Sequence, residues 1–333
     1  MKAIKFFAIS AMAAAMITSC SNDDDLSQSN YPSDNIIRVT AGVNNAKTRA
    51  EGAGTEMKND FSLTIVNKNA PKYTYTDKVF SKKSGDWACS ETLLWQKSDA
   101  LVDIVAFAPA QTGKFNGVYA NGSIQPIAYS VASDQSTSSA NNDLLYYYAK
   151  DFKPGDKLVD KKLNIQFNHA FCMIDIVVTL GTEFNKPNVL DDSPIVKVTL
   201  GGTKIEANVD VTKAATSVVT ASETAAATDI TTTKGIFTKA ENADKKADPE
   251  VNAISRFSCI TIPQPVAANT FKVSLKTADK LYEWTSKDPV ELKSGYRYTL
   301  ELTMGNNVVL LKGGSITAKP WTEITSDKPL ETD

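Results

Sequence analysis

Short runs of alternating apolar and polar residues are the feature that most limits how this chain can fold. In residues 296–303, Tyr, Tyr, Leu and Leu alternate with Arg, Thr, Glu and Thr. A period of two places the apolar side chains on one face of a β-strand and leaves the other face to water. The pattern recurs at residues 37–43, 61–65 and 271–276, separated by Gly, Pro, Asn and Asp. Since no sustained helical period intervenes, the sequence predicts an all-β fold of packed antiparallel sheets.

The length of the chain predicts two domains. The roughly 280 residues after Arg49 exceed what one β-sandwich usually holds. A turn containing Pro154 and Gly155 marks the best boundary. We therefore expect an N-terminal sandwich over residues 50–156 and a C-terminal sandwich over residues 157–333.

Two features stand out in the second half. Alternating apolar residues predict one long strand over residues 163–180. A stretch rich in Thr, Ser and Ala, followed by charged residues, predicts an exposed, mobile insertion over about residues 212–250 that contains one short strand or helix.

Charge and histidine content exclude several classes of protein. The chain has 36 Lys and Arg against 38 Asp and Glu, a net charge of −2, and so lacks the basic footprint of a nucleic-acid binder. Beyond the N-terminus, no apolar run approaches the roughly 20 residues needed to span a bilayer. His169 is the only His, so a His-based metal cage is impossible. We expect no metal and no cofactor.

The N-terminus is predicted to be an export signal. Residues 1–19 begin with two Lys, continue with an uncharged apolar stretch and end in small residues. Ile17–Cys20 resembles a bacterial lipobox, in which the Cys receives a lipid and becomes the mature N-terminus; the alternative is an ordinary signal peptide that contains a Cys. The acidic and polar residues after Cys20 predict a solvated tether. They resemble the signal that sends lipoproteins of Bacteroides-type bacteria to the outer face of the outer membrane.

No residue pattern predicts catalysis. His169 lies among apolar strand residues, which favours a structural imidazole bonded to backbone or Asn over a catalytic base. Asp191 and Asp192 stand in an Asp-Asp-Ser-Pro sequence and are more simply turn formers. The chain contains no nucleophile elbow, no C-x-x-C pair and no H-E-x-x-H helix. The sequence therefore predicts a protein that is not an enzyme.

Cysteine and tryptophan residues allow two interpretations each. With Cys20 assigned to lipid, Cys89, Cys172 and Cys259 remain and allow at most one disulfide; we expect three structural thiols, with a bridge between Cys172 and Cys259 as the alternative. At least half of the tryptophans and of the Tyr146–Tyr148 group should be core aromatics, the alternative being a platform on which sugars stack. The tryptophans are Trp87, Trp95, Trp284 and Trp321.

Several stretches, in order along nearly the whole chain, resemble the fimbrillin family of Bacteroides-type bacteria, the lipoprotein-derived pilins similar to the Porphyromonas major and minor fimbrial subunits. They are the lipobox at Cys20, Val39-Thr40-Ala41 leading to Thr48-Arg49-Ala50, Leu94-Trp95 with Val105–Pro109, Asp143–Tyr146, Phe167–Ala170, Gly295–Leu300 and Trp321. The resemblance implies two transthyretin-like β-sandwich domains and a role in building surface fimbriae. It further implies that a trypsin-like protease cuts after an Arg, that loss of the N-terminal strand opens a groove, and that a C-terminal strand of another subunit fills this groove.

The residues fit this mechanism. Arg49 is the one of four Arg that lies among small polar residues outside a strand pattern, so cutting between Arg49 and Ala50 would detach residues 20–49. The removable strand is predicted to present Ile37, Val39, Ala41 and Val43 on one face. The donor strand is expected within about residues 305–333, where Pro320 would end strand pairing. Its candidate residues are Val308, Val309, Leu310, Leu311, Ile316 and Ala318.

The expected partners follow from this interpretation. They are other fimbrial subunits in a homopolymer, an Arg-specific protease, the outer membrane through the lipid on Cys20, and a host or bacterial glycan or protein receptor, but no nucleic acid. A stalk subunit is favoured over a tip or an anchor. Two alternatives stay open: a monomeric sandwich that keeps both terminal strands, and a surface glycan-binding lipoprotein.

Overall fold

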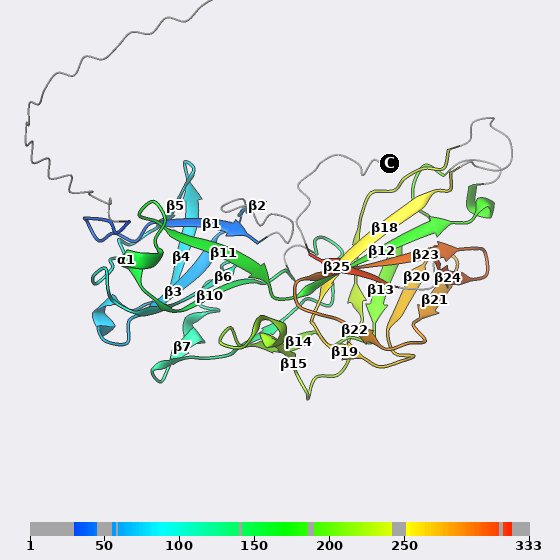
Figure 1. Ribbon diagram of the computed structural model, residues 1–333. Coiled ribbons are helices and arrows are strands. Elements are labelled where there is room, and N and C mark those ends of the chain that lie inside the picture. The colour runs from blue at the N-terminus through cyan, green and yellow to red at the C-terminus, as the bar shows by residue number, and fades with distance from the viewer. Residues whose placement is uncertain are drawn as a thin grey trace, which may run out of the picture.

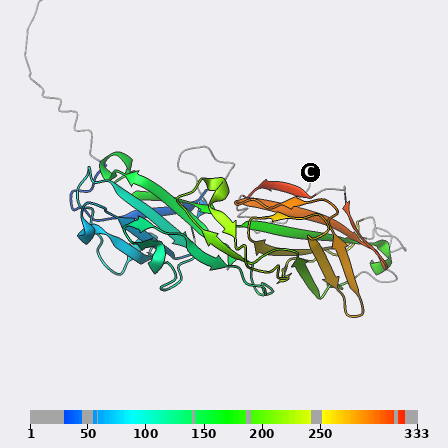
Figure 2. The ribbon, with the colours of Figure 1, turned by 90° about the horizontal axis from the view of Figure 1, so that it is seen from below.

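The computed structural model describes residues 30–44, 55–57, 59–139, 142–185, 190–241, 251–312 and 316–321. These residues form strands, one four-residue helix, α1 (Pro154–Lys157), and a few 3-10 turns, which confirms the all-β prediction. Two lobes rich in strands lie end to end (Figures 1 and 2). Within the described part, no helix is long and apolar enough to cross a membrane. The predicted signal peptide, Cys20 and the Arg49–Ala50 bond lie outside the described residues.

The first lobe is one sheet that closes on itself. Its strands run in the order β11-β10-β6-β3-β4-β5-β1-β2, and β1 also pairs with β11. Phe61, Leu63 and Phe167 are among the fully buried side chains of its apolar cluster. The strands are β1 (Val39–Val43), β2 (Thr55–Glu56), β3 (Phe61–Val66), β4 (Tyr75–Lys83), β5 (Asp86–Cys89), β6 (Val102–Ala108), β10 (Leu145–Phe152) and β11 (Leu163–His169).

The second lobe is built on two further sheets. One runs β17-β18-β12-β23, with β24 and β25 both paired to β23, and the other runs β16-β13-β20-β21. The inward face of β12 is apolar, as alternation predicts. The strands are β12 (Cys172–Leu180), β13 (Lys197–Gly201), β16 (Ile230–Thr231), β17 (Thr233–Lys234), β18 (Ile254–Thr261), β20 (Lys272–Lys276), β21 (Leu281–Thr285), β23 (Tyr296–Met304), β24 (Val309–Leu311) and β25 (Thr317–Pro320).

Pairing between the described strands is mostly antiparallel, as expected, with two exceptions. β1 pairs with β11 in parallel, and β12 pairs with β23 in parallel.

Three small sheets complete the described fold. They are β9 (Ile127–Ser130) with β14 (Glu206–Val209) and β15 (Val219–Ala221), β7 (Tyr119–Ala120) with β8 (Ser123–Ile124), and β19 (Pro265–Val266) with β22 (Val290–Glu291).

The single long strand expected over residues 163–180 is wrong. The segment forms β11 in the first lobe and β12 in the second. Buried side chains of β11 stand at the odd positions 163, 165 and 167, whereas those of β12 stand at even positions from 172 onwards. This one-residue shift in the alternation marks the change of sheet. As a result, the first sheet includes β11, which lies beyond the boundary expected at residue 156.

A segment of the first half crosses into the second lobe. β9 pairs with β14, and the buried side chain of Gln135 bonds to both backbone groups of Ile260: its Nε2 donates to the carbonyl oxygen at 2.8 Å, and its Oε1 accepts from the N–H at 2.8 Å. The amide thus takes the place of a neighbouring strand beside β18. Phe107 and Tyr129 also join the apolar cluster of the second lobe, so the two halves share a core.

The Thr-, Ser- and Ala-rich stretch is part of the fold where it is described. Residues 212–241 supply β15, β16 and β17. Val218, Ile230 and Thr232 are buried. Most of residues 212–241 are exposed, as expected, but the expectation of one short strand or helix is wrong for them, because three short strands form. Residues 242–250 lie outside the described part.

Replacing Gln135 with Leu should destabilise the protein. Leu leaves the Ile260 N–H and C=O without their buried partners, and each unsatisfied group costs about 1–3 kcal/mol. The midpoint of urea unfolding measures the loss. Gln125→Leu is the control, because the Gln125 side-chain amide donates to Ala120 and Ser123 of its own hairpin turn. Equal midpoints for the two variants would contradict the assigned role of Gln135.

Candidate functional site

The strand predicted to be removable, β1, fills the slot between β5 and β11. Ile37, Val39 and Val43 are 5%, 4% and 1% exposed and belong to the first-lobe cluster, while Ala41 packs against it half-buried. Its register with β11 runs in parallel from Val39 opposite Leu163 to Val43 opposite Phe167. Fully burying an aliphatic side chain stabilises by about 1.5–3 kcal/mol, so this short strand contributes substantially to the lobe.

Backbone hydrogen bonds fasten both ends of β1. The Leu163 N–H donates to the Arg38 carbonyl oxygen at 2.8 Å, and the Asn44 N–H donates to the Phe167 carbonyl oxygen at 2.7 Å. Before the strand begins, Asp34 and Arg38 form an ion pair at 2.6 Å. The hydrogen bond from Arg38 holds the pKa of the Asp34 carboxyl well below its usual range. Residues 45–54, which include Arg49, connect β1 to β2.

The donor-strand candidates lie on one edge of β23. β24 pairs with residues 302–304 of β23 and β25 pairs with residues 296–299. Val309 is buried, whereas Val308 and Leu310 are 50% and 59% exposed. All four residues of β25, Ala318 included, are exposed, and Ile316 before it is half-buried. β25 therefore rests on its parent sheet with little apolar burial of its own.

Trp321 anchors the segment that contains β25. Its ring stacks on the imidazole of His169, with centroids 3.9 Å apart. Its backbone N–H donates to the Gly295 carbonyl oxygen at 2.7 Å. His169 Nδ1 lies 2.8 Å from Asp143 Oδ2, so the imidazole is packed in the structure as expected, but its partner is a carboxylate rather than backbone or Asn. His169 ends β11, so the stack ties the end of a first-lobe strand to the segment that contains β25. In Figure 1, β25 lies near the junction of the two lobes.

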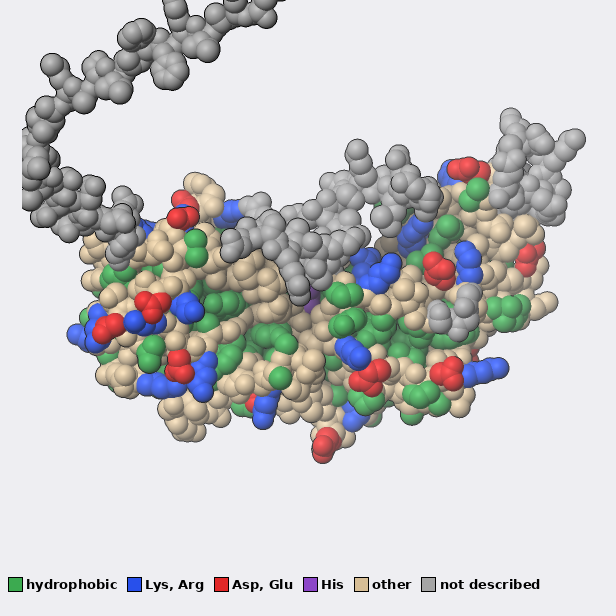
Figure 3. Space-filling model, viewed as in Figure 1, with side chains coloured by type: hydrophobic (Ala, Val, Ile, Leu, Met, Phe, Trp, Pro, Cys, Tyr) green, Lys and Arg blue, Asp and Glu red, His purple; other side chains and the backbone are tan. Residues whose placement is uncertain are grey.

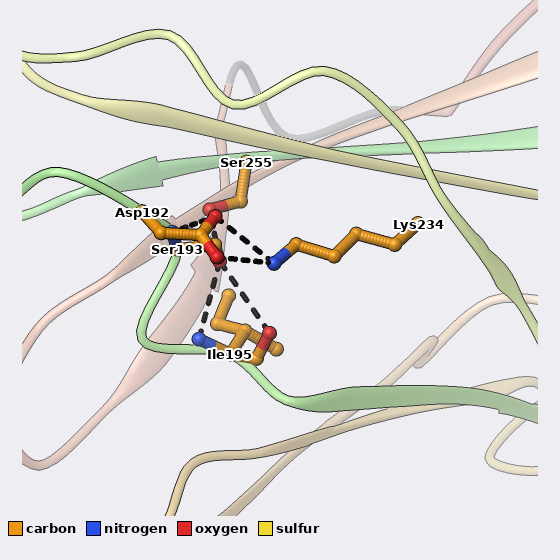
Figure 4. Close-up of polar contacts among 5 residues, drawn as sticks. All are labelled: Asp192, Ser193, Ile195, Lys234 and Ser255. Atoms are coloured by element: carbon orange, nitrogen blue, oxygen red, sulfur yellow. Dashed lines mark hydrogen bonds and ion pairs between the residues drawn. The ribbon is translucent and has the colours of Figure 1, made fainter.

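Asp191 and Asp192 do not form a catalytic pair. The Asp192 carboxylate accepts two bonds from Lys234 Nζ, both at 3.0 Å, and one from the Ser193 N–H (Figure 4). Asp191 pairs instead with Lys239 at 2.7 Å. These lysine contacts lower the pKa of each carboxyl. Ser193 Oγ also lies 2.7 Å from Ser255 Oγ, so the turn fastens this loop to β18, as turn formers would.

The cysteines in the described part of the chain form no disulfide. Cys89, Cys172 and Cys259 are free thiols there. Burial raises the pKa of the Cys172 and Cys259 thiols, which keeps them protonated and weakly nucleophilic. No cluster of three or more His, Cys, Asp or Glu among the described residues could hold a metal ion. Figure 3 shows acidic and basic side chains interspersed over one face of the molecule.

Comparison with protein families identifies the chain. The model of the family described as fimbrillin-like matches residues 48–321. The chain belongs to the fimbrillin-like family. The resemblance read from the sequence is thereby confirmed. No curated protein sequence matches the chain.

Solved structures share the fold of this fimbrillin-like chain. A candidate cell adhesion protein from Bacteroides ovatus has a TM-score of 0.59 at 18% identity, over 88% of this chain and 99% of its own. One from Bacteroides uniformis has a TM-score of 0.55 at 14% identity, over 87% and 100%. A fimbrial protein from Bacteroides vulgatus has a TM-score of 0.51 at 15% identity, over 86% and 99%. At these identities the likeness establishes a common fold.

Replacing Trp321 with Ala should release the C-terminal segment. The change removes the stack on His169, and truncation of a buried Trp costs about 3–5 kcal/mol. Amide hydrogen exchange of residues 317–321 should then accelerate by more than about tenfold, while exchange in β12 stays unchanged. Lys319→Ala is the control, since Lys319 is exposed. Equal exchange rates in the two variants would show that Trp321 does not anchor β25.

Proposed function

We propose that the protein is a structural, non-enzymatic subunit of cell-surface fimbriae. It reaches the outer membrane as a lipoprotein modified at Cys20, is cut after Arg49, and polymerises by donor-strand exchange to support adhesion and biofilm formation. Membership of the fimbrillin-like family supports the fimbrial role. The position of β1 carries the finer proposal, because this strand joins β5 to β11 and is linked to β2 through the residues that include Arg49.

Cutting after Arg49 would make β1 a separate peptide. Its departure would leave the edge of β11 without backbone partners and would open the apolar sites of Ile37, Val39 and Val43. An unpaired strand edge beside apolar sites is a template for an added strand. A strand from another subunit would restore both the backbone bonds and the buried surface, which supplies the driving force for polymerisation.

The other three arginines are poor protease sites. Arg38 lies beside β1 and pairs with Asp34. Arg256 lies in β18 and donates to Thr238, and Arg297 lies in β23 and pairs with Asp175. Residues in paired strands do not enter a protease cleft without local unfolding. These contacts leave Arg49, in a small and polar sequence, as the favoured site.

Digestion of purified residues 20–333 with an Arg-specific protease tests the proposed function. We expect cleavage after Arg49 alone by mass spectrometry, followed by a heat-sensitive ladder of oligomers on a non-boiled gel. Arg49→Ala should abolish both cleavage and ladder, because Arg38, Arg256 and Arg297 lie within or directly beside paired strands. Arg38→Lys is the matched control: it removes a second Arg, keeps the cation beside Asp34, and should leave the ladder intact.

A chain that stays monomeric after clean cutting would contradict a polymerising stalk subunit and would favour a tip, an anchor or a glycan-binding lipoprotein. One observation favours glycan binding: Trp284 lines a cavity of about 520 Å³ together with Tyr298 and Ile316. Trp87, by contrast, packs edge-on against Phe61 in the first-lobe cluster. Saturable polysaccharide binding lost in Trp284→Ala but kept in Trp87→Ala, without any ladder, would support that function.

A further inference from the structure

A cavity of about 520 Å³ lies in the second lobe, where the edge strand β21 faces the C-terminal segment. Residues 284–291, which run from β21 into β22, supply most of its lining, and Tyr298, Leu311 and Ile316 contribute to the rest. Its volume falls within the range of about 300–1,000 Å³ that is typical of small-molecule sites. The cavity is therefore large enough to hold a small organic ligand.

Trp284 differs from the other three tryptophans in its surroundings. The rings of Trp87, Trp95 and Trp321 each pack against another aromatic ring. Within the described part of the chain, the Trp284 ring stacks on no other aromatic ring, and its N–H donates no hydrogen bond. The side chain is half-buried against the second-lobe cluster and lines the cavity. Part of this ring, with an unused donor, is thus available to a ligand.

Charged side chains of both signs line the same cavity without partners. Lys287, Asp288 and Glu291 are exposed, and in the described structure none of these three side chains forms an ion pair or a hydrogen bond. They supply an ammonium donor and two carboxylate acceptors. An anionic ligand would be repelled by the carboxylates and a cationic ligand by the ammonium group. A neutral ligand that both donates and accepts hydrogen bonds fits all three.

Hydrogen bonds fix the loop that carries these groups. Ser286 is 7% exposed; its N–H donates to the Phe271 carbonyl oxygen and its Oγ donates to the Asp288 carbonyl oxygen, both at 2.8 Å. The Tyr298 hydroxyl donates to the Glu291 carbonyl oxygen at 2.8 Å. The loop is therefore ordered before a ligand arrives, which lowers the entropy cost of binding.

We propose that this cavity binds a short neutral oligosaccharide, with one sugar ring stacked on Trp284. The C–H face of a pyranose ring is apolar and packs against the indole, while the sugar hydroxyls both donate and accept hydrogen bonds. Asp288 and Glu291 would accept bonds from these hydroxyls, and Lys287 and the indole N–H would donate to them. The inference gives the proposed fimbrial subunit a ligand site, and it does not depend on strand exchange.

The residues assigned to sugar contact do not belong to the C-terminal segment. All of them lie within residues 284–291, whereas Leu311 and Ile316 supply an apolar wall from the segment that contains the donor candidates. Exchange of that segment would remove this wall and leave the stacking and polar groups in place. Binding is therefore measured in the uncut chain, in which the whole cavity is present.

Calorimetric titration of the uncut chain tests the site. The chain from residue 20 would carry Arg49→Ala, so that the result is independent of cutting and polymerisation. The neutral probes are trisaccharides of glucose, galactose, mannose, xylose and N-acetylglucosamine; trigalacturonate and a glucosamine trimer are the anionic and cationic probes. We expect saturable binding of at least one neutral trisaccharide and weaker binding of both charged probes. Trp284→Ala should then weaken the affinity at least about tenfold, because the stacking contact is lost.

A second variant covers the case in which Trp284→Ala disturbs the fold. Asp288 is exposed and its side chain has no partner within the described residues, so Asp288→Ala should fold as the parent chain does and still lose about fivefold in affinity. Glu283→Ala is the matched control, since Glu283 is an exposed carboxylate of β21 that does not line the cavity; its affinity should be unchanged.

Three results would overturn the proposal. They are the failure of every neutral trisaccharide to bind, tighter binding of a charged probe, and an affinity in Trp284→Ala or Asp288→Ala equal to that of the parent chain. None of them bears on the oligomer ladder, and a missing ladder after cutting would leave the sugar site standing. The two proposals therefore fail separately.

Discussion

The contact that the first lobe depends on is the parallel pairing of β1 with β11. Seven other strands form the rest of that sheet, and β1 joins β11 to β5 so that the sheet closes. Three buried aliphatic side chains and the backbone bonds at Arg38 and Asn44 hold β1 in place. A closed sheet has no free edge there. The strand that closes the sheet is also the first described strand of the chain, so one cut in the connection to β2 would turn a structural element into an exchangeable one.

Contacts elsewhere in the molecule join the first lobe, which holds the β1 slot, to the second lobe. β9 pairs with β14 across the two halves, and Gln135 completes the edge of β18 from the opposite half of the chain. β6 is buried on both faces, because Ile104 and Ala106 join one apolar cluster while Val105 and Phe107 join the other. His169 lies between these regions and holds Trp321. The proposed acceptor slot and the proposed donor segment therefore belong to one connected structure.

Alternation predicted the strand class and the inward face of β1 well, since both follow from local burial. It failed where the phase of the alternation shifts: the sequence around Ala170 is apolar on both sides of the break, and only the change from odd to even positions signals that β11 and β12 belong to different sheets. Parallel pairing of β1 with β11 joins residues more than a hundred positions apart, which no local pattern encodes. The contact of His169 with Asp143 and the bonds of Gln135 to Ile260 were missed for the same reason. In the Thr- and Ser-rich tract, the polar composition gave no sign of the few side chains that are buried.

Hydrogen exchange at β11 measures most directly whether β1 occupies an exchangeable slot. The account predicts that the β11 amides facing β1, beginning with that of Leu163, are protected in the uncut chain. They should exchange rapidly once the fragment ending at Arg49 has been cut and separated, and should regain protection in the oligomer ladder. Amides that stay protected after β1 has left, or that remain unprotected in the assembled ladder, would contradict the central claim that a second subunit restores this edge.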